Sequence, residues 1–140
     1  MIEVFLDTSY AISLSVESDQ KHAQALALAL QLQKDKTRLV VTRAVMLEIG
    51  NSLSKARYRH AGFALLSALE ADPMVEIIEL TVEDYQTALA LFQSRTDKEW
   101  GLVDCVSFVV MQRRGLFDAL TADGHFVQAG FRALLLEATL

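Results

Sequence analysis

Short β-branched runs alternate along this chain with longer stretches of strong helix formers, and that alternation constrains its fold more than any other feature. Residues 38–42, for example, read Arg-Leu-Val-Val-Thr, which is typical of a buried strand. On the same grounds, strands are predicted at residues 4–6, 38–42, 75–80, 119–121 and 134–136. Because strands that alternate with helices pair in parallel through right-handed crossovers, we expect an α/β fold with a mainly parallel sheet and helices on both faces.

The segments between the strands have helical composition and recognisable helix ends. Residues 22–36 alternate Ala and Leu, which mimics the period of a strand, but neither residue is β-branched and both favour helix. Thr81 followed by Asp84 resembles a capping box, and Gly115 is typical of a helix C-terminus. Helices are therefore predicted after Asp7-Thr8-Ser9 and at residues 22–36, 44–53, 61–71, 81–94 and 102–114.

The length of 140 residues suits one domain, and we expect residues 1–140 to form a single unit with one core. Hydrophobic residues make up 52% of the chain, yet no apolar run approaches the roughly 20 residues that a membrane span requires. No basic and apolar leader precedes the first strand, and the single cysteine, Cys105, cannot form an internal disulfide. These features predict a protein of the reducing cytoplasm.

Four carboxylates stand in apolar surroundings and are the main clue to function: Asp7, Glu48, Asp104 and Asp123. An ionised carboxylate in such a setting costs several kcal/mol unless its charge is compensated. No lysine or arginine is adjacent to any of the four in the sequence. A divalent metal ion would supply the missing positive charge.

The predicted fold brings the four acids together. Asp7 and Asp123 each follow a strand, and ligands of open α/β sheets bind outside the carboxyl ends of the strands. Glu48 and Asp104 are expected in the opening turns of helices that start at that edge, and the apolar neighbours of Asp104 direct its carboxylate into a cleft. Taken singly, each acid also has an ordinary interpretation as a helix cap, a turn residue or part of an exposed helix face.

Oxygen ligands without thiolate or histidine suit Mg²⁺ or Mn²⁺, which also bind phosphate oxygens, so hydrolysis of a phosphate ester is the predicted chemistry. His125, close to Asp123, is interpreted as a structural residue or a substrate contact. Hydroxyl groups near the acids are candidates to hydrogen-bond the carboxylates. These are the hydroxyls of Thr8, Ser9, Ser107 and Thr121.

The formal charge of −5 argues against indiscriminate binding to a polyanion but does not exclude a nucleic-acid substrate. Basic residues cluster twice, and the ordinary interpretation of both clusters is a solvated helix face. The clusters are Lys55, Arg57 and Arg59, and Arg113 with Arg114.

Four stretches resemble the PIN-domain proteins, in particular the VapC-type toxin ribonucleases. They read LDTS from residue 6, EIGN from residue 48, DKEWGLVDCVSF from residue 97 and LTADGHF from residue 120. The resemblance implies a three-layer α/β/α sandwich, a site for Mg²⁺ or Mn²⁺, and cleavage of single-stranded RNA. It also implies a homodimer and a small antitoxin protein that blocks the site.

In this resemblance Asp7, Glu48, Asp104 and Asp123 match the first to fourth acids of the family, as catalytic residues and metal ligands. Gly101 stands where the family often has serine, which removes a possible hydroxyl contact without removing a ligand. Two alternatives remain open: a catalytically inactive PIN fold that binds RNA or protein, and an aspartyl phosphotransferase or receiver-like domain. The latter is disfavoured because Ser9 stands where a second acid is needed.

Overall fold

Five strands pair in the order β3-β2-β1-β4-β5, and every pairing in the sheet is parallel. The computed structural model describes residues 2–137. Its strands are β1 (Glu3–Leu6), β2 (Arg38–Thr42), β3 (Val75–Ile78), β4 (Asp118–Leu120) and β5 (Arg132–Ala133). The predicted α/β class with a mainly parallel sheet is therefore confirmed.

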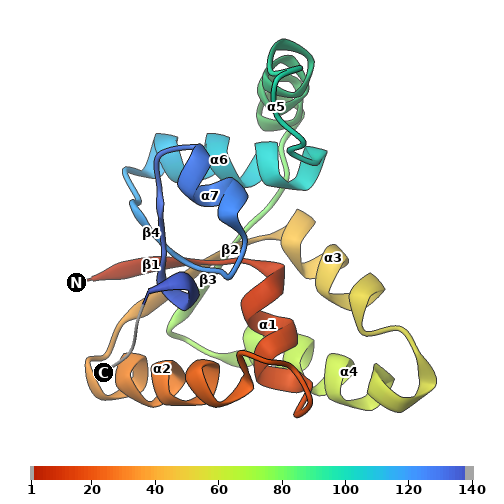
Figure 1. Ribbon diagram of the computed structural model, residues 1–140, viewed down its shortest axis with the longest axis vertical. Coiled ribbons are helices and arrows are strands. Elements are labelled where there is room, and N and C mark those ends of the chain that lie inside the picture. Colours follow the sequence, from red (N-terminus) through yellow and green to blue (C-terminus); the bar gives the residue numbers. More distant parts are fainter. Residues whose placement is uncertain (1, 138–140) are drawn as a thin grey trace.

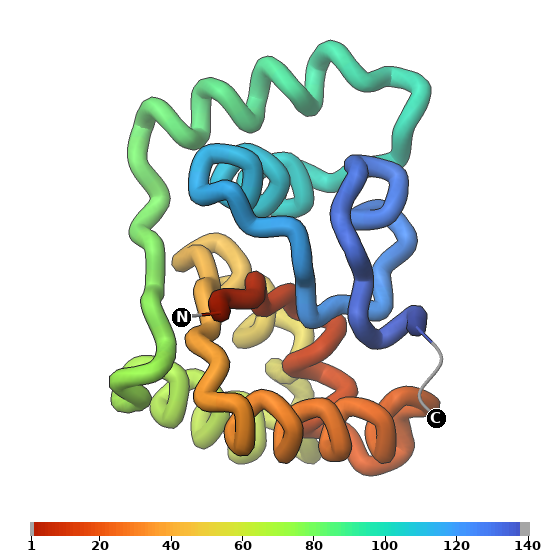
Figure 2. The backbone as a smooth tube through the Cα atoms, turned by 90° about the vertical axis from the view of Figure 1, so that its left-hand side faces the viewer, coloured from red at the N-terminus to blue at the C-terminus, as the bar shows by residue number. Residues whose placement is uncertain are grey.

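Helices cover both faces of the sheet, so the three-layer arrangement is also confirmed (Figure 1). The helices are α1 (Thr8–Ser15), α2 (His22–Lys34), α3 (Arg43–Ser52), α4 (Ala56–Ala71), α5 (Val82–Ser94), α6 (Leu102–Arg114), α7 (Gly124–Gln128) and the short 3₁₀ helix η1 (Leu134–Leu136). Helices α1, α2 and α4 lie on one side, while α6 and α7 lie on the other with α5 packed outside α6. Figure 2 shows the chain running from α4 through β3 to α5, with only residues 79–81 connecting β3 to α5.

The central strands form the middle of the core. Phe5 on β1, Val40 on β2 and Leu120 on β4 have no solvent exposure. Strands that are buried on both faces read as continuous apolar runs rather than as alternating patterns, which explains why residues 4–6 and 38–42 could be recognised as strands. Within residues 2–137, no helix combines the length and the apolar character needed to cross a membrane.

The prediction of a strand at residues 134–136 is wrong. These three leucines form η1, and the last strand, β5, is the preceding pair Arg132–Ala133. The backbone N–H of Leu135 donates to the carbonyl oxygen of Thr121, and the Leu135 side chain is fully buried. A short apolar run in a sequence indicates burial but not secondary structure. Leucine has no β-branch to favour extended backbone over a helical turn, so three leucines fit either one.

Two helices also differ from prediction. Helix α4 begins at Ala56, five residues before the predicted start, because its first turns are exposed and lack an apolar stripe. Helix α7 was not predicted, since a five-residue helix beside Asp123 and Gly124 reads as a turn in sequence.

Candidate active site

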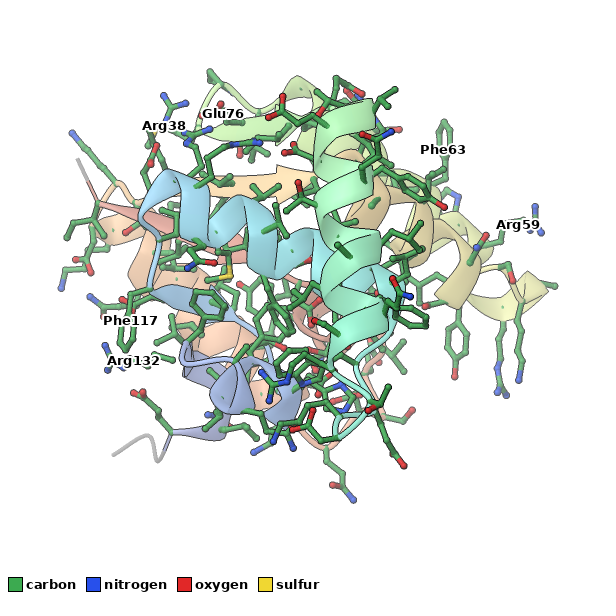
Figure 3. The ribbon with its side chains drawn as sticks, turned by 90° about the horizontal axis from the view of Figure 1, so that it is seen from above. Arg38, Arg59, Phe63, Glu76, Phe117 and Arg132 are labelled. Atoms are coloured by element: carbon green, nitrogen blue, oxygen red, sulfur yellow. The ribbon has the colours of Figure 1, made fainter. Side chains whose placement is uncertain are left out.

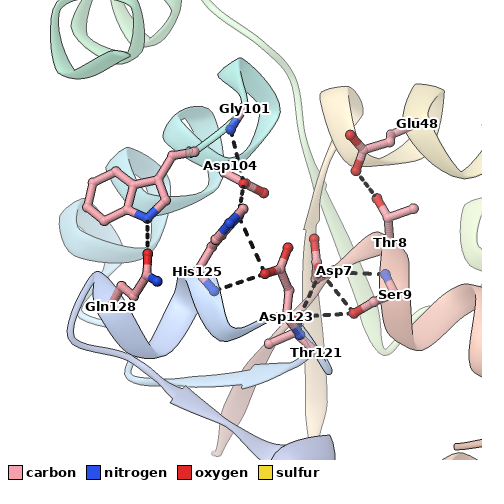
Figure 4. A network of polar contacts seen from close by, with 11 residues as sticks. Asp7, Thr8, Ser9, Glu48, Gly101, Asp104, Thr121, Asp123, His125 and Gln128 are labelled. Atoms are coloured by element: carbon pink, nitrogen blue, oxygen red, sulfur yellow. Dashed lines mark hydrogen bonds and ion pairs between the residues drawn. The ribbon is translucent and has the colours of Figure 1, made fainter. Parts of the chain in front are cut away.

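A cleft of about 460 Å³ opens at the carboxyl edge of the sheet, and all four predicted acids line it. Asp7 follows β1 and Asp123 follows β4, while Glu48 and Asp104 come from α3 and α6. Glu48 lies in the second turn of α3, which begins at Arg43, directly after β2 and one residue before the predicted start. Figure 4 shows the carboxylates facing a common space.

Asp7 is the most deeply buried of these acids, with only 4% of its surface exposed. It caps α1, and its Oδ2 accepts hydrogen bonds from the hydroxyls of Thr121 at 2.7 Å and Ser9 at 3.1 Å. Burial raises the pKa of Asp7 to about 6, although the hydrogen bonds oppose this shift; the nearby charge of Asp104 adds to it. The ionised carboxylate is thus held in a place that lacks a compensating charge.

Glu48 faces the same cleft from the other side of Asp7. The hydroxyl of Thr8, the first residue of α1, donates a hydrogen bond to Oε1 of Glu48. The position of α3 is set by Thr42, whose side chain caps the helix by accepting from the N–H of Val45 at 3.1 Å. The end of β1 and the helix after β2 are therefore joined directly at the site.

Asp104 lies in the first turn of α6 and reaches back to the start of that helix. Its Oδ2 accepts from the N–H of Gly101 at 3.2 Å, so the glycine that replaces the expected serine contributes its backbone instead. The ring of His125 contacts the same oxygen, with Nδ1 at 3.0 Å. The prediction that Asp104 points into a cleft is confirmed.

His125 joins the acids more closely than the sequence indicated. Its Nδ1 lies 3.0 Å from Oδ2 of Asp104 and 3.4 Å from Oδ1 of Asp123. Because carboxylates only accept hydrogen bonds, Nδ1 carries the proton. The hydrogen bond to Asp104, with the charges of Asp123, Asp104 and Glu99, raises the pKa of His125 against the opposing effect of desolvation. The acids therefore favour the protonated form of the His125 ring.

Asp123 caps α7, and its Oδ1 accepts from the N–H of His125 at 2.9 Å. Both Asp7 and Asp123 thus also perform the ordinary capping role that each suggests in isolation. Capping uses only one oxygen of each side chain, so it does not compete with a role in the cleft.

Three of the four predicted hydroxyl contacts are present. Thr8 reaches Glu48, while Ser9 and Thr121 both reach Asp7 and lie 3.0 Å from each other. The prediction for Ser107 is wrong: its Oγ is fully buried and has no hydrogen-bond partner among residues 2–137. It lies one turn further along α6 than Asp104, where it is buried inside the protein and does not line the cleft.

The four carboxylates share a pattern that fits a divalent metal ion. In each, the hydrogen bonds found among residues 2–137 engage one oxygen: Oδ2 of Asp7 and of Asp104, Oδ1 of Asp123 and Oε1 of Glu48. No lysine or arginine in this part of the chain lies within 4 Å of them, as the ion pairs there all involve other acids or His125. Hard oxygen donors with their second oxygens free suit Mg²⁺ or Mn²⁺.

Donor atoms of Asp104, Asp123 and His125 all lie within 4.8 Å of one another, which is close enough to share an ion. A cavity of about 640 Å³ between α1, α2 and α4 is larger than the cleft, but its lining is mostly apolar and contains none of the four acids. The chemistry is therefore assigned to the smaller cleft.

Comparison with known proteins places the chain among similar sequences and folds. The PIN domain profile matches residues 4–132. A 23S rRNA-specific endonuclease of Mycobacterium tuberculosis, VapC20, is 27% identical over 128 residues, which are 91% of this chain and 95% of that protein. The crystal structure of VapC20, described as a sarcin-ricin loop cleaving toxin, superposes with a TM-score of 0.81 at 26% identity, over 91% of this chain and 95% of the other.

Two more distant structures share the fold. VapBC2 from Rickettsia felis, bound to a DNA fragment from its promoter, has a TM-score of 0.64 at 16% identity, covering 95% of this chain and 97% of the other. FitAcB from Neisseria gonorrhoeae has a TM-score of 0.60 at 16% identity, covering 93% and 94%.

Proposed function

The chain belongs to the PIN domain family, and on this premise we propose that it is a metal-dependent endoribonuclease, the toxin of a toxin–antitoxin pair. The observation that carries the proposal is the cleft itself, in which four carboxylates each keep one oxygen free and none is neutralised by lysine or arginine among residues 2–137. Similarity to an RNA endonuclease over most of the chain supports RNA as the substrate.

In this proposal Asp7, Glu48, Asp104 and Asp123 hold Mg²⁺ or Mn²⁺. When bound, the ion stabilises charge on the phosphoryl group and lowers the pKa of a water molecule. The chain's own groups fix the acids: the hydroxyls of Thr121 and Ser9 hold Asp7, and the Nδ1 proton of His125 holds Asp104.

We expect cleavage of RNA only in the presence of Mg²⁺ or Mn²⁺, with products that carry 5′-phosphate and 3′-hydroxyl ends, because water is the attacking group. The substrates to test are an unstructured single-stranded RNA and a 23S rRNA fragment with the sarcin-ricin loop, the RNA named for VapC20. End mapping after incubation with metal or excess chelator is the measurement. Cyclic 2′,3′-phosphate ends, or full activity in chelator, would exclude this mechanism.

A small antitoxin is the proposed protein partner, in line with the resemblance to VapC-type toxins. Four carboxylates in one cleft attract cations, so an arginine or lysine of the partner is expected to enter it and displace the metal. The proposed setting is the cytoplasm, where RNA is available. If no RNA is cleaved under any metal condition while a protein partner still binds, the inactive binding module becomes the better description.

We propose a homodimer formed through α5. Val82, Tyr85, Leu89 and Phe92 make an apolar stripe along this helix, and each is at least 41% exposed. Only two residues of α5 are charged, and one of them, Asp84, is buried against Arg113. The stripe is symmetric about residue 87, so two antiparallel copies would set Val82 against Phe92 and Tyr85 against Leu89 across a twofold axis.

Leu89→Arg should therefore convert the dimer to a monomer, because it places a charge at the centre of the apolar contact. Light scattering after size-exclusion chromatography measures the change. Leu30→Arg on α2 is the matched control, since Leu30 is also exposed, at 69%, and lies on a different face. A Leu89→Arg protein with the mass of the unaltered protein would remove α5 as the interface.

A further inference from the structure

We propose that the corner between α3 and α4, residues 54–60, binds the RNA backbone beside the active cleft. We call this segment the basic corner. The inference rests on the proposed function and adds the surface that positions the substrate. It contains Lys55, Arg57, Arg59 and His60 and has no acidic residue, although the chain as a whole carries a formal charge of −5.

The arginines of the basic corner differ from all the others in the chain. Six of the eight arginines form ion pairs with carboxylates: Arg38, Arg43, Arg95, Arg113, Arg114 and Arg132. Within residues 2–137, Arg57 and Arg59 are the two that have no carboxylate within 4 Å, and Lys55 has none either. A charge that folding leaves unpaired is available to an anionic ligand.

The basic corner is the direct continuation of the cleft wall. Helix α3 contributes both Glu48 and its last residue, Ser52, to the lining. Lys55 follows Ser52 by three residues, so their Cα atoms are at most about 11 Å apart. A single RNA strand whose scissile phosphate lies at the acids can therefore extend along α3 to the basic corner. The positive charge of the basic corner complements the acidic cleft, because the acids hold metal while the arginines hold phosphate.

Both arginines are partly fixed before any ligand binds. The Nε of Arg59 donates to the carbonyl oxygen of Ser54 at 3.0 Å, and the guanidinium of Arg57 lies over the ring of Tyr58, 4.8 Å from its centroid. No group among residues 2–137 accepts a hydrogen bond from the terminal N–H groups of these two side chains, so both can bind phosphate oxygens, and a fixed guanidinium loses less entropy on binding. Figure 3 shows Arg59 at the outer end of the corner, pointing away from the body of the protein.

The test compares two charge-matched double variants. Arg57→Gln with Arg59→Gln removes two positive charges from the basic corner, and Lys34→Gln with Lys36→Gln removes two from the end of α2, where the lysines also lack carboxylate partners among residues 2–137. Each is made in the Asp7→Asn protein, which is expected to bind RNA without cutting it. The probe is a labelled single-stranded oligoribonucleotide, titrated at several salt concentrations.

The arginine variant should raise Kd roughly 10- to 100-fold at low salt, as expected for two lost charge-assisted contacts. The slope of log Kd against log salt should fall by about 1.4, since each phosphate contact to a single strand contributes about 0.7. The lysine variant should keep the parent values. In the cleaving protein, the arginine variant should raise KM and leave kcat unchanged. Circular dichroism verifies the fold of both variants.

The outcomes separate this inference from the proposed function. If the unaltered protein cuts RNA but the arginine variant binds with the parent Kd and salt slope, the basic corner is not a substrate site and the nuclease function stands. A loss of affinity for an antitoxin, with RNA binding unchanged, overturns the inference in favour of a protein interface. Absence of any RNA binding or cleavage by the unaltered protein overturns both proposals.

Discussion

Replacing Asp7 by Asn should lower the rate of RNA cleavage by roughly 100-fold or more, in line with the loss of a principal electrostatic contribution. Asparagine has nearly the same shape, and its carbonyl oxygen can still accept from the hydroxyls of Thr121 and Ser9. What it lacks is the negative charge at the second oxygen, which none of the hydrogen bonds found among residues 2–137 engages. The fold should therefore survive while the affinity for metal does not.

Asp104→Asn should have a similar effect, because its free oxygen faces the same cleft. Ser107→Ala is the matched control. Ser107 lies one turn away on α6 and is more deeply buried than Asp104, but its hydroxyl bonds to no group among residues 2–137. The control should cleave at the rate of the unaltered protein in a single-turnover assay.

Expression in cells extends the same comparison to the toxin proposal. The unaltered chain should arrest growth, and the Asp7→Asn chain should not. Growth arrest of equal strength with both would separate toxicity from the acidic site. Cleavage near the normal rate by a correctly folded Asp7→Asn or Asp104→Asn protein would remove that residue from the set of metal ligands.

The acids could be located from sequence because their positions follow from local rules. Asp7 comes directly after β1 and Asp123 three residues after the end of β4, and parallel strands end at one edge, so the fold itself carries them to the same place. Asp104 could be placed because an acid amid apolar helix residues needs either a cleft or a partner. In these cases the residues next to each acid in the sequence were enough to predict where it lies.

His125 and Ser107 show where such reasoning fails. The contact between His125 and Asp104 joins α7 to α6 across 21 residues of sequence, and no local pattern encodes the relative position of two helices. Ser107 was expected near the acids because it follows Asp104 by one helical turn, but that turn carries it into a fully buried part of α6 and away from the cleft. The only early sign of His125 was its place two residues after an acid at a strand end.

For the basic corner, the sequence identified the cluster of basic residues but not whether their charges are paired. Clusters at Lys55 to Arg59 and at Arg113 with Arg114 look alike in the sequence. In the structure, Arg113 pairs with Asp84 and Arg114 with Glu76, so the second cluster is neutralised by the fold. Whether an arginine is free depends on acids that are distant in sequence, and only three-dimensional structure identifies them.

The metal-free protein should become more stable when Asp7 is replaced by Asn, even though the same change abolishes activity. Burial raises the pKa of Asp7 from 3.8 to about 6, so the folded state binds its proton more tightly than the unfolded state does. Stability therefore falls as pH rises from about 4 to 6, and above this range the ionised Asp7 costs on the order of 3 kcal/mol. Asparagine removes this cost because it cannot ionise.

Thermal unfolding in excess chelator is the measurement. At pH 7.5 the Asp7→Asn protein should melt roughly 5 to 10 °C above the unaltered one, and the difference should shrink through pH 4 and vanish at about pH 3, below the pKa of Asp7 in both states. Millimolar Mn²⁺ should close nearly all of this gap, since binding to the folded state alone adds about 2.7 kcal/mol at 100 times Kd. Neither Asp7→Asn nor Asp104→Asn should gain this stabilisation.

The two effects on the melting temperature, a rise on Asp7→Asn without metal and a rise on adding Mn²⁺ to the unaltered protein, together distinguish a metal site from a structural one. If Asp7 served only to cap α1, Asp7→Asn would keep the cap, because asparagine caps a helix as well as aspartate does, and Mn²⁺ would not change the melting temperature of the unaltered protein. If the acids were separate exposed groups, neither the substitution nor the metal would change the melting temperature. Without metal the ionised carboxylate of Asp7 destabilises the folded protein, and with metal it stabilises it. The buried carboxylate is then retained to bind the ion rather than to stabilise the fold.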